Sequence, residues 1–229
     1  MSRFSDGELV RQSANLLVNK ISHDIGTPLG SIFVWLEVLK HDRLSDEERT
    51  RALAGIRGSA AMLWEYFEEL TGLSRMIAGM VRLQSRPILL AVVIDSAVEA
   101  ASPSALAKCV KVSKILDPQL GPVAGDADHL ELLVRALLSN AVAFTPREGK
   151  VNVSLTRSDT CAQITVSDDG PGIDGDLDRI REGFPPTTKR GRDVRLYLAH
   201  LLALLHGGSI TDLTEGEGNS FTVRMPLMD

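Results

Sequence analysis

The sequence predicts two parts, a helical hairpin followed by an α/β layered domain. Residues 1–86 carry apolar side chains at helical spacing, whereas residues 87–229 alternate short β-like runs with helical stretches. Hydrophobic residues make up 44% of the 229-residue chain, so each part can bury a core. Charged residues make up 24%, and the net charge of −5 comes with no basic run, so we expect no nucleic-acid partner.

Cysteine usage and hydropathy indicate the compartment. Cys109 and Cys161 form no CxxC pair and do not suggest a disulfide framework, which favours a reducing environment. The apolar runs, such as residues 88–94, are much shorter than the roughly 20 residues that span a membrane. No signal peptide follows Met1. We therefore expect a cytoplasmic protein with no membrane span.

Two capping boxes mark the starts of two long helices. The S-x-x-E spacing at Ser5–Glu8 begins a helix that runs to about Lys40, and Ser45–Glu48 repeats it after a short connection. The apolar positions of the second helix follow a three/four alternation, at Leu53, Ile56, Ala60, Leu63, Phe67, Leu70, Ile77 and Val81. A lone hairpin cannot enclose such a seam, but two hairpins form a four-helix bundle, so we expect a homodimer.

The first helix contains the string HDIGTPL at residues 23–29. Thr27 lies four residues after His23 and shares its helix face. Pro28 has no backbone N–H and its ring meets the carbonyl of Asp24, so we expect a bend that costs about 3 kcal/mol. A single helical histidine is more often a tolerated surface or core residue. A costly proline beside a titratable side chain nevertheless indicates a functional site.

The string H-D-x-x-T-P-L closely resembles the phosphoacceptor box of two-component histidine kinases. The resemblance implies that His23 accepts a phosphoryl group and that Asp24 orients and activates its imidazole. It also implies that Thr27 positions the water that removes phosphate from a partner. The partner would be the receiver domain of a response regulator, and the protein would be a homodimer. One departure is Gly26, which stands where a basic residue is common.

The pattern changes after residue 86. The β-like runs are residues 88–93, 110–116, 151–156, 162–166, 209–213 and 220–225. The helical stretches are residues 95–107, 127–144 and 194–206, and Gly207-Gly208 is expected to end the last of them. We expect a mixed sheet with helices on one face. This pattern resembles the ATPase sandwich shared by histidine kinases, gyrases and related chaperones.

Two stretches resemble nucleotide-binding boxes of that ATPase family. The string LLSNA at residues 137–141 resembles its asparagine box, which implies that Asn140 is a ligand of Mg²⁺, a cation that prefers oxygen atoms. The alternative is an ordinary asparagine near a helix end. The string VSDDGPGI at residues 166–173 resembles its D-x-G-x-G box. The alternative there is a common acidic, glycine-rich turn.

The second box implies that Asp168 accepts the exocyclic amine of adenine. Gly170 and Gly172 would let the backbone pass close to the base, since neither carries a Cβ.

Other positions depart from the family pattern. Ala136 and Ala143 stand where the family often has polar residues that face phosphate. In the third, glycine-rich box, Gly191 is retained, but Asp193 and Arg195 replace the other two glycines. Those glycines would leave a helix N-terminus bare for phosphate. We expect Asp193 to cap that helix itself, which is typically worth about 1 kcal/mol.

These residues indicate a two-component signalling protein in which His23 relays phosphoryl groups to an aspartate on a response regulator. The first interpretation is a soluble histidine kinase with impaired or weak autophosphorylation, which would use ATP and Mg²⁺. The alternative is an ATP-independent histidine phosphotransferase that relays phosphate between receiver domains. A third interpretation is a non-catalytic regulator. No sensor segment precedes the first helix in this sequence, so we expect control by a separate sensor protein.

Overall fold

The computed structural model describes residues 25–41, 44–77, 83–171, 192–212 and 218–228. The chain divides into two compact units, a helical one and an α/β one. The predicted boundary between residues 86 and 87 remains a prediction.

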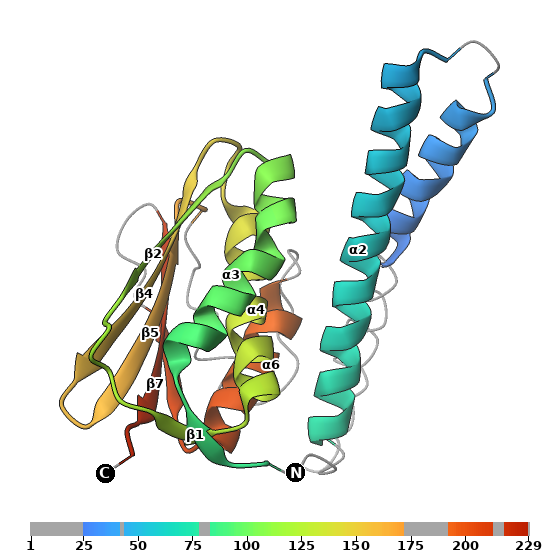
Figure 1. Ribbon diagram of the computed structural model, residues 1–229. Coiled ribbons are helices and arrows are strands. Elements are labelled where there is room, and N and C mark those ends of the chain that lie inside the picture. Colours follow the sequence, from blue (N-terminus) through green and yellow to red (C-terminus); the bar gives the residue numbers. More distant parts are fainter. Residues whose placement is uncertain (1–24, 42–43, 78–82, 172–191, 213–217, 229) are drawn as a thin grey trace, which may run out of the picture. The chain divides into compact units, whose positions relative to one another are not determined.

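The helical unit contains the helix Ile25–Leu39 and the longer helix α2 (Asp46–Ile77), joined by a short connection (Figure 1). The predicted capping box at the start of α2 is confirmed. Glu48 N donates a hydrogen bond to Ser45 Oγ (3.3 Å), and Ser45 N donates one to Glu48 Oε2 (2.9 Å). The hydrogen bonds from Ser45 hold the pKa of the Glu48 carboxyl below its usual range.

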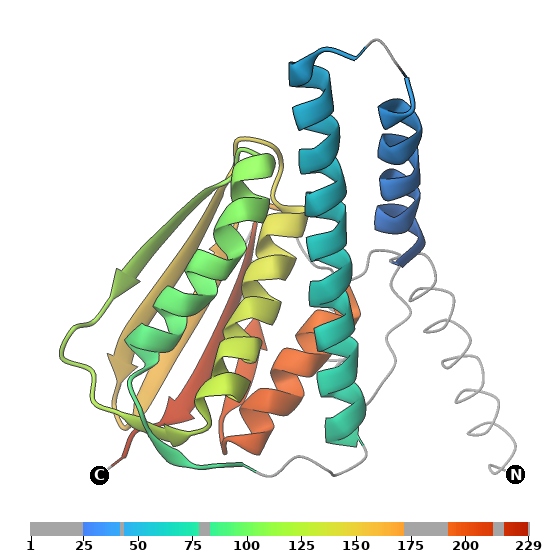
Figure 2. The same ribbon diagram turned by 45° about the vertical axis from the view of Figure 1, so that its right-hand side comes forward.

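The two helices of this unit lie side by side (Figure 2), and Trp35 of the first helix contacts Gly55 of α2. A Cβ atom added to Gly55 would lie 2.3 Å from Trp35 Nε1, so the indole ring occupies the space above this glycine. Gly58, one turn further along α2, has open space in the same place. A side chain larger than that of glycine would therefore collide with Trp35 at position 55, whereas position 58 has room for one.

The apolar seam predicted for α2 is only partly covered within one chain. Ile56 and Leu63 are half-buried, but Leu53 and Phe67 are 55% and 61% exposed. One chain supplies a two-helix hairpin, and the four-helix bundle remains a prediction.

The α/β unit is built on a five-stranded mixed sheet with the strand order β2-β4-β5-β7-β6. Its strands are β2 (Lys111–Leu116), β4 (Lys150–Ser158), β5 (Cys161–Asp168), β6 (Ser209–Asp212) and β7 (Asn219–Pro226). β2 and β4 are parallel, and the other neighbouring strands are antiparallel. A separate two-stranded sheet pairs β1 (Arg86–Ile88) with β3 (Val123–Gly125).

Three helices cover one face of the sheet, as the sequence predicted (Figures 1 and 2). They are α3 (Leu90–Ala107), α4 (Ala127–Phe144) and α6 (Arg192–Leu205). The bounds of α4 agree with the prediction, and Asp126 caps its N-terminus by accepting hydrogen bonds from the backbone N–H groups of Asp128 and His129.

The core lies between this sheet and α4. Alternate residues of the two central strands are buried, because successive side chains of a strand point to opposite faces. These buried positions are Val151, Val153, Leu155, Ala162, Ile164 and Val166. The buried positions of α4 recur at helical spacing and include Leu130, Leu133, Val134, Leu137 and Leu138. Each such side chain stabilises the fold by about 1.5–3 kcal/mol, so the rotation of α4 about its axis is firmly set.

Several predicted elements differ in the structure. The predicted strand at residues 88–93 is wrong, because the chain is helical from Leu90 and buries Leu90, Val93 and Ile94 at helical spacing. A short apolar run fits either structure by periodicity alone. The three-residue strand β3 was not predicted. The end of α6 agrees with the prediction, since Gly207 has φ +69° and Gly208 N donates to Ala203 O (2.9 Å).

The start of α6 corrects the interpretation of Asp193. The helix begins at Arg192, so Asp193 lies within its first turn and is not the N-cap residue.

One helix in the described ranges, α3, is long and apolar enough by length and composition to cross a membrane. A core helix can share these properties. Leu90, Ile94 and Ala97 are buried, and α3 packs against α4 and β2. In this fold α3 therefore forms part of the domain core.

Replacing Gly55 and Gly58 of α2 by alanine, one at a time, separates packing from helix propensity. Gly58→Ala should stabilise the hairpin by about 1 kcal/mol, because alanine is the better helix former. Gly55→Ala should be less stable than Gly58→Ala by about 1–3 kcal/mol, because its methyl group collides with Trp35. Both tryptophans, Trp35 and Trp64, lie in the hairpin, so urea unfolding followed by tryptophan fluorescence reports this unit. Equal stabilisation by both substitutions would contradict the close contact.

Candidate functional site

The predicted site residues fall into two groups. His23, Asp24, Gly172 and Gly191 lie outside the described residues, and so does the predicted bend, which involves the carbonyl of Asp24. Thr27 is exposed on the helix Ile25–Leu39. Its proposed role in phosphate removal remains a prediction.

In the α/β unit, Asn140, Asp168 and Gly170 are all buried.

Asp168 is the last residue of β5 and is 5% exposed. Its Oδ1 atom accepts a hydrogen bond from the backbone N–H of Gly170 (2.7 Å) and another from Asn219 Nδ2 (2.8 Å). Asn219 is the first residue of the neighbouring strand β7 and lies directly opposite Asp168. A carboxylate is an acceptor with capacity for about four hydrogen bonds. These two hydrogen bonds orient the carboxylate of Asp168.

The turn after Asp168 lies against the C-terminal end of α4. A Cβ atom added to Gly170 would lie 2.5 Å from Asp168 Oδ1 and 3.0 Å from Phe144 O, so only glycine fits this position. Asp169, which is exposed, anchors the outer side of the same turn by accepting a hydrogen bond from Lys150 N (2.8 Å). The asparagine box and the D-x-G-x-G box are thus adjacent in the fold.

Asn140 lies in the last part of α4 and is 2% exposed. Its Oδ1 atom is buried and has no hydrogen-bond partner in the part of the chain that the structure describes. An unpaired buried acceptor costs about 1–3 kcal/mol, which native proteins usually avoid through a protein, water or ligand partner. An amide oxygen of this kind is a suitable ligand for Mg²⁺.

The C-terminal end of α4 is held by two further groups. Thr145 is fully buried and donates through Oγ1 to Ala141 O (2.8 Å). Lys108 Nζ, from the segment after α3, donates to Val142 O (3.0 Å) and Ala143 O (2.6 Å). Burial lowers the pKa of Lys108. A cation at this end also interacts favourably with the helix dipole, so α4 is fixed close to Asn140.

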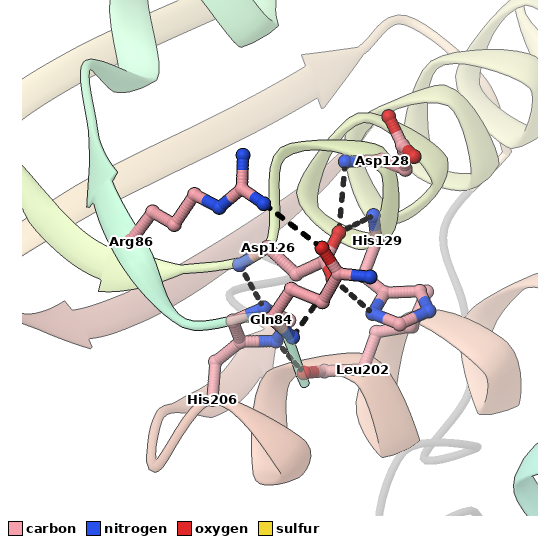
Figure 3. Close-up of polar contacts among 7 residues, drawn as sticks. All are labelled: Gln84, Arg86, Asp126, Asp128, His129, Leu202 and His206. Atoms are coloured by element: carbon pink, nitrogen blue, oxygen red, sulfur yellow. Dashed lines mark hydrogen bonds and ion pairs between the residues drawn. The ribbon is translucent and has the colours of Figure 1, made fainter. Parts of the chain in front are cut away.

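The N-terminal end of α4 is fixed by a polar cluster around Asp126, which Figure 3 shows. Asp126 Oδ2 accepts a hydrogen bond from Gln84 N (3.1 Å), and Arg86 Nη2 donates to Gln84 Oε1 (3.1 Å). Burial raises the pKa of Asp126, but the hydrogen bond from Gln84 N and the neighbouring His129 outweigh it, so the pKa lies below its usual value. The charged carboxylate suits the positive end of the helix dipole.

His206, which follows α6, joins this cluster to α6. Its Nε2 atom accepts a hydrogen bond from Asp126 N (3.2 Å), so its Nδ1 atom carries the proton and donates to Leu202 O (2.8 Å). Both ring nitrogens are therefore used in structural hydrogen bonds. Burial lowers the pKa of His206. The neutral imidazole holds the start of α4 against the end of α6.

The residues present fit Mg²⁺ and an adenine nucleotide at two points. The buried oxygen of Asn140, which has no hydrogen-bond partner among the described residues, suits a metal ion, and the carboxylate of Asp168 is an acceptor of the kind that an amine requires. Ala136 is buried and Ala143 is exposed, and neither side chain offers a polar group to phosphate.

Sequence reasoning did not identify Asn219 as part of the site. The sequence offered one signal. Asn219 lies between Gly218 and the β-like run that was predicted to begin at residue 220.

The C-terminal part of the chain matches a family model. Residues 125–229 match the histidine kinase-, DNA gyrase B- and HSP90-like ATPase family. The chain is 27% identical to the sensor protein DivL of Caulobacter vibrioides over 91% of its length, covering 27% of that protein. It is 28% identical to the histidine protein kinase DivJ of the same organism over 99% of its length, covering 39% of that protein. The chain thus spans well under half of these curated relatives.

Solved structures share the fold. The Acinetobacter baumannii histidine kinase AdeS superposes with a TM-score of 0.62 at 19% identity, over 90% of this chain and 98% of that one. Full-length ShkA in complex with AMPPNP gives 0.62 at 24% identity, over 93% of this chain and 46% of that one. A structure described as a bacterial phosphotransferase gives 0.55 at 21% identity, over 93% of this chain and 95% of that one.

The pH dependence of stability should report the neutral state of His206. Its folded-state pKa lies below the ordinary value of 6.5, so the unfolded chain takes up the proton first as the pH falls. The stabilisation is complete above pH 6.5 and is lost progressively below it. Urea unfolding midpoints measured from pH 8 to pH 5 by circular dichroism should therefore fall with pH.

His206→Gln, which has no titratable ring, should flatten that slope. His129→Gln leaves both hydrogen bonds of His206 in place and should retain its contribution. A wild-type slope that is unchanged in His206→Gln would contradict the assignment.

Proposed function

We propose that this chain transfers phosphoryl groups in two-component signalling. Residues 125–229 match the histidine kinase-, DNA gyrase B- and HSP90-like ATPase family, and the relatives DivL and DivJ support a histidine kinase catalytic core. His23 is the proposed phosphoacceptor, and Asp24 orients its imidazole. The phosphoryl group then passes to an aspartate on the receiver domain of a response regulator. Thr27 is proposed to position water for phosphate removal.

The main support for an ATP-dependent role is the buried oxygen of Asn140, which has no hydrogen-bond partner among the described residues. Asn140 lies on α4, and the end of α4 contacts the turn after Asp168. Asn140 would hold Mg²⁺, and Asp168 would hold the base, with Gly170 and the proposed Gly172 and Gly191 leaving room for the nucleotide. Bound Mg-ATP would supply the phosphoryl group for His23. The solved relative ShkA, described in complex with AMPPNP, supports this site by analogy of fold.

The autokinase activity is proposed to be weak. Phosphoryl transfer depends mainly on positioning and on electrostatic stabilisation of the phosphates. Ala136 and Ala143 give the site no polar side chain for this purpose, and Asp193 adds a carboxylate to the first turn of α6. A free helix N-terminus attracts phosphate, whereas a carboxylate there competes with it.

These departures support a second candidate, an ATP-independent phosphotransferase that relays phosphate between receiver domains through His23. The similarity of fold to a structure described as a bacterial phosphotransferase supports this alternative. The retained Asp168 site favours the autokinase. A non-catalytic regulator is the third alternative, and the HDIGTP string at residues 23–28 argues against it.

We also propose a homodimer in the cytoplasm. The hairpin exposes large apolar side chains that a second copy would bury, including Phe33, Val34, Leu53, Trp64 and Phe67. Cys109 and Cys161 are both free thiols, which suits a reducing compartment.

Charge introduced into the hairpin seam should dissociate the dimer. Leu53→Glu combined with Phe67→Glu should sediment as a monomer at concentrations where the wild type sediments as a dimer, because burial of a charge is costly. Arg51→Glu alters an exposed position of α2 and serves as the control. A wild-type monomer at tens of micromolar, or a dimeric double variant, would refute the proposal.

Radiolabelling from two phosphate donors distinguishes the first two functions. Incubation with γ-labelled ATP and Mg²⁺ should give weak, acid-labile and alkali-stable label on the wild type and none on His23→Ala. The control His41→Ala changes an exposed histidine and should keep the label. Asn140→Ala should lose labelling from ATP but keep labelling from a phosphorylated receiver domain. Label from the receiver alone would establish the relay, and label from neither donor would exclude both functions.

A further inference from the structure

The side chain of Asn219 is a buried polar group in the base-binding part of the site. It is 4% exposed, and its Nδ2 atom donates to two acceptors, Asp168 Oδ1 (2.8 Å) and Pro171 O (3.2 Å). Asn219 therefore contacts both the carboxylate that would hold the base and the turn that follows it.

These two contacts fix the orientation of the amide group. A backbone carbonyl such as Pro171 O accepts hydrogen bonds and cannot donate them, so the amide atom that faces it is the NH₂ group. The remaining atom, Asn219 Oδ1, is buried and has no hydrogen-bond partner among the described residues. This oxygen is bonded to the same carbon atom as Nδ2, the atom that contacts Asp168 Oδ1.

A buried acceptor without a partner is unfavourable, and it requires a donor from elsewhere. The unpaired oxygens of Asn140 and Asn219 both belong to residues of the same site. Asn140 would be matched by a cation. Asn219 lies next to another acceptor, so its natural match is a ligand that presents more than one N–H group.

We propose that Asn219 is a specificity-determining residue, which accepts the second N–H of the exocyclic amine of the base while Asp168 accepts the first. This inference rests on the proposed nucleotide role of Asp168. An exocyclic amine carries two N–H groups and satisfies both acceptors. An oxo group at the same place has no hydrogen to donate and would face two acceptor oxygens.

Calorimetric titration of the full chain with ATP, N6-methyl-ATP and inosine triphosphate tests the proposal. The methyl group replaces one amine hydrogen, and inosine carries the oxo group. The wild type should bind each analogue at least about tenfold more weakly than ATP, the factor that one hydrogen bond typically carries. This comparison needs no variant and so does not depend on the folding of one.

Asn219→Ala gives the second arm. Its affinity for ATP should fall about tenfold, whereas N6-methyl-ATP should then bind within about twofold of ATP, because the methyl group occupies the space vacated by the amide. A residue that only positions Asp168 would weaken both nucleotides equally. Asn152→Ala, on an exposed asparagine of β4, should change neither affinity. Thermal unfolding without nucleotide checks that each variant is folded.

Equal wild-type affinities for ATP and N6-methyl-ATP would overturn the proposal. So would an equal loss of both in Asn219→Ala, or the absence of any nucleotide binding by the wild type. Phosphoryl transfer from a receiver domain to His23 involves no nucleotide. Its outcome is therefore independent of this result, and the proposed phosphotransfer function stands or falls separately.

Discussion

The α/β unit depends on the buried carboxylate of Asp168. Its hydrogen bonds with Gly170 N and Asn219 Nδ2 join the end of β5, the turn after it and the start of β7. A buried carboxylate without partners would be strongly destabilising, so these three segments must be assembled together. The same turn contacts Phe144 O and so sets where α4 ends relative to the sheet. One side chain thus links the core of the domain to its proposed chemistry.

The sequence predicted elements well where short-range signals agree. The bounds of α4 follow from apolar residues at helical spacing, with Asp126 as an N-cap. The capping box of α2 and the glycine end of α6 depend on residues that are neighbours in the chain, and both predictions are confirmed. Predictions failed where packing decides the structure. Residues 88–93 suited a strand or a helix equally, and burial of Leu90 and Ile94 selected the helix.

The candidate site was predictable only to the extent that its residues form local strings. Asn140 and Asp168 were identified within such strings, and both are buried as expected for a site. Asn219 was missed because its partner Asp168 is 51 residues away, and strand register alone brings the two together. The cap that Lys108 provides for α4 has the same origin, since its acceptors lie 34 and 35 residues further along the chain. Long-range hydrogen bonds of this kind leave no periodic trace in a sequence.

The separation of 51 residues between Asp168 and Asn219 affects the order in which parts of the domain fold. β4 and β5 are consecutive in the chain and form a hairpin at little entropic cost, whereas pairing of β5 with β7 must close a loop of about fifty residues. Contacts between residues far apart in the chain form slowly, because the entropy of closure is lost before they stabilise the fold. The base-binding corner therefore belongs to the late stages of folding. A nascent chain acquires it only once β7 has been synthesised, and a product that ends before β7 lacks the strand that joins β5 to β6.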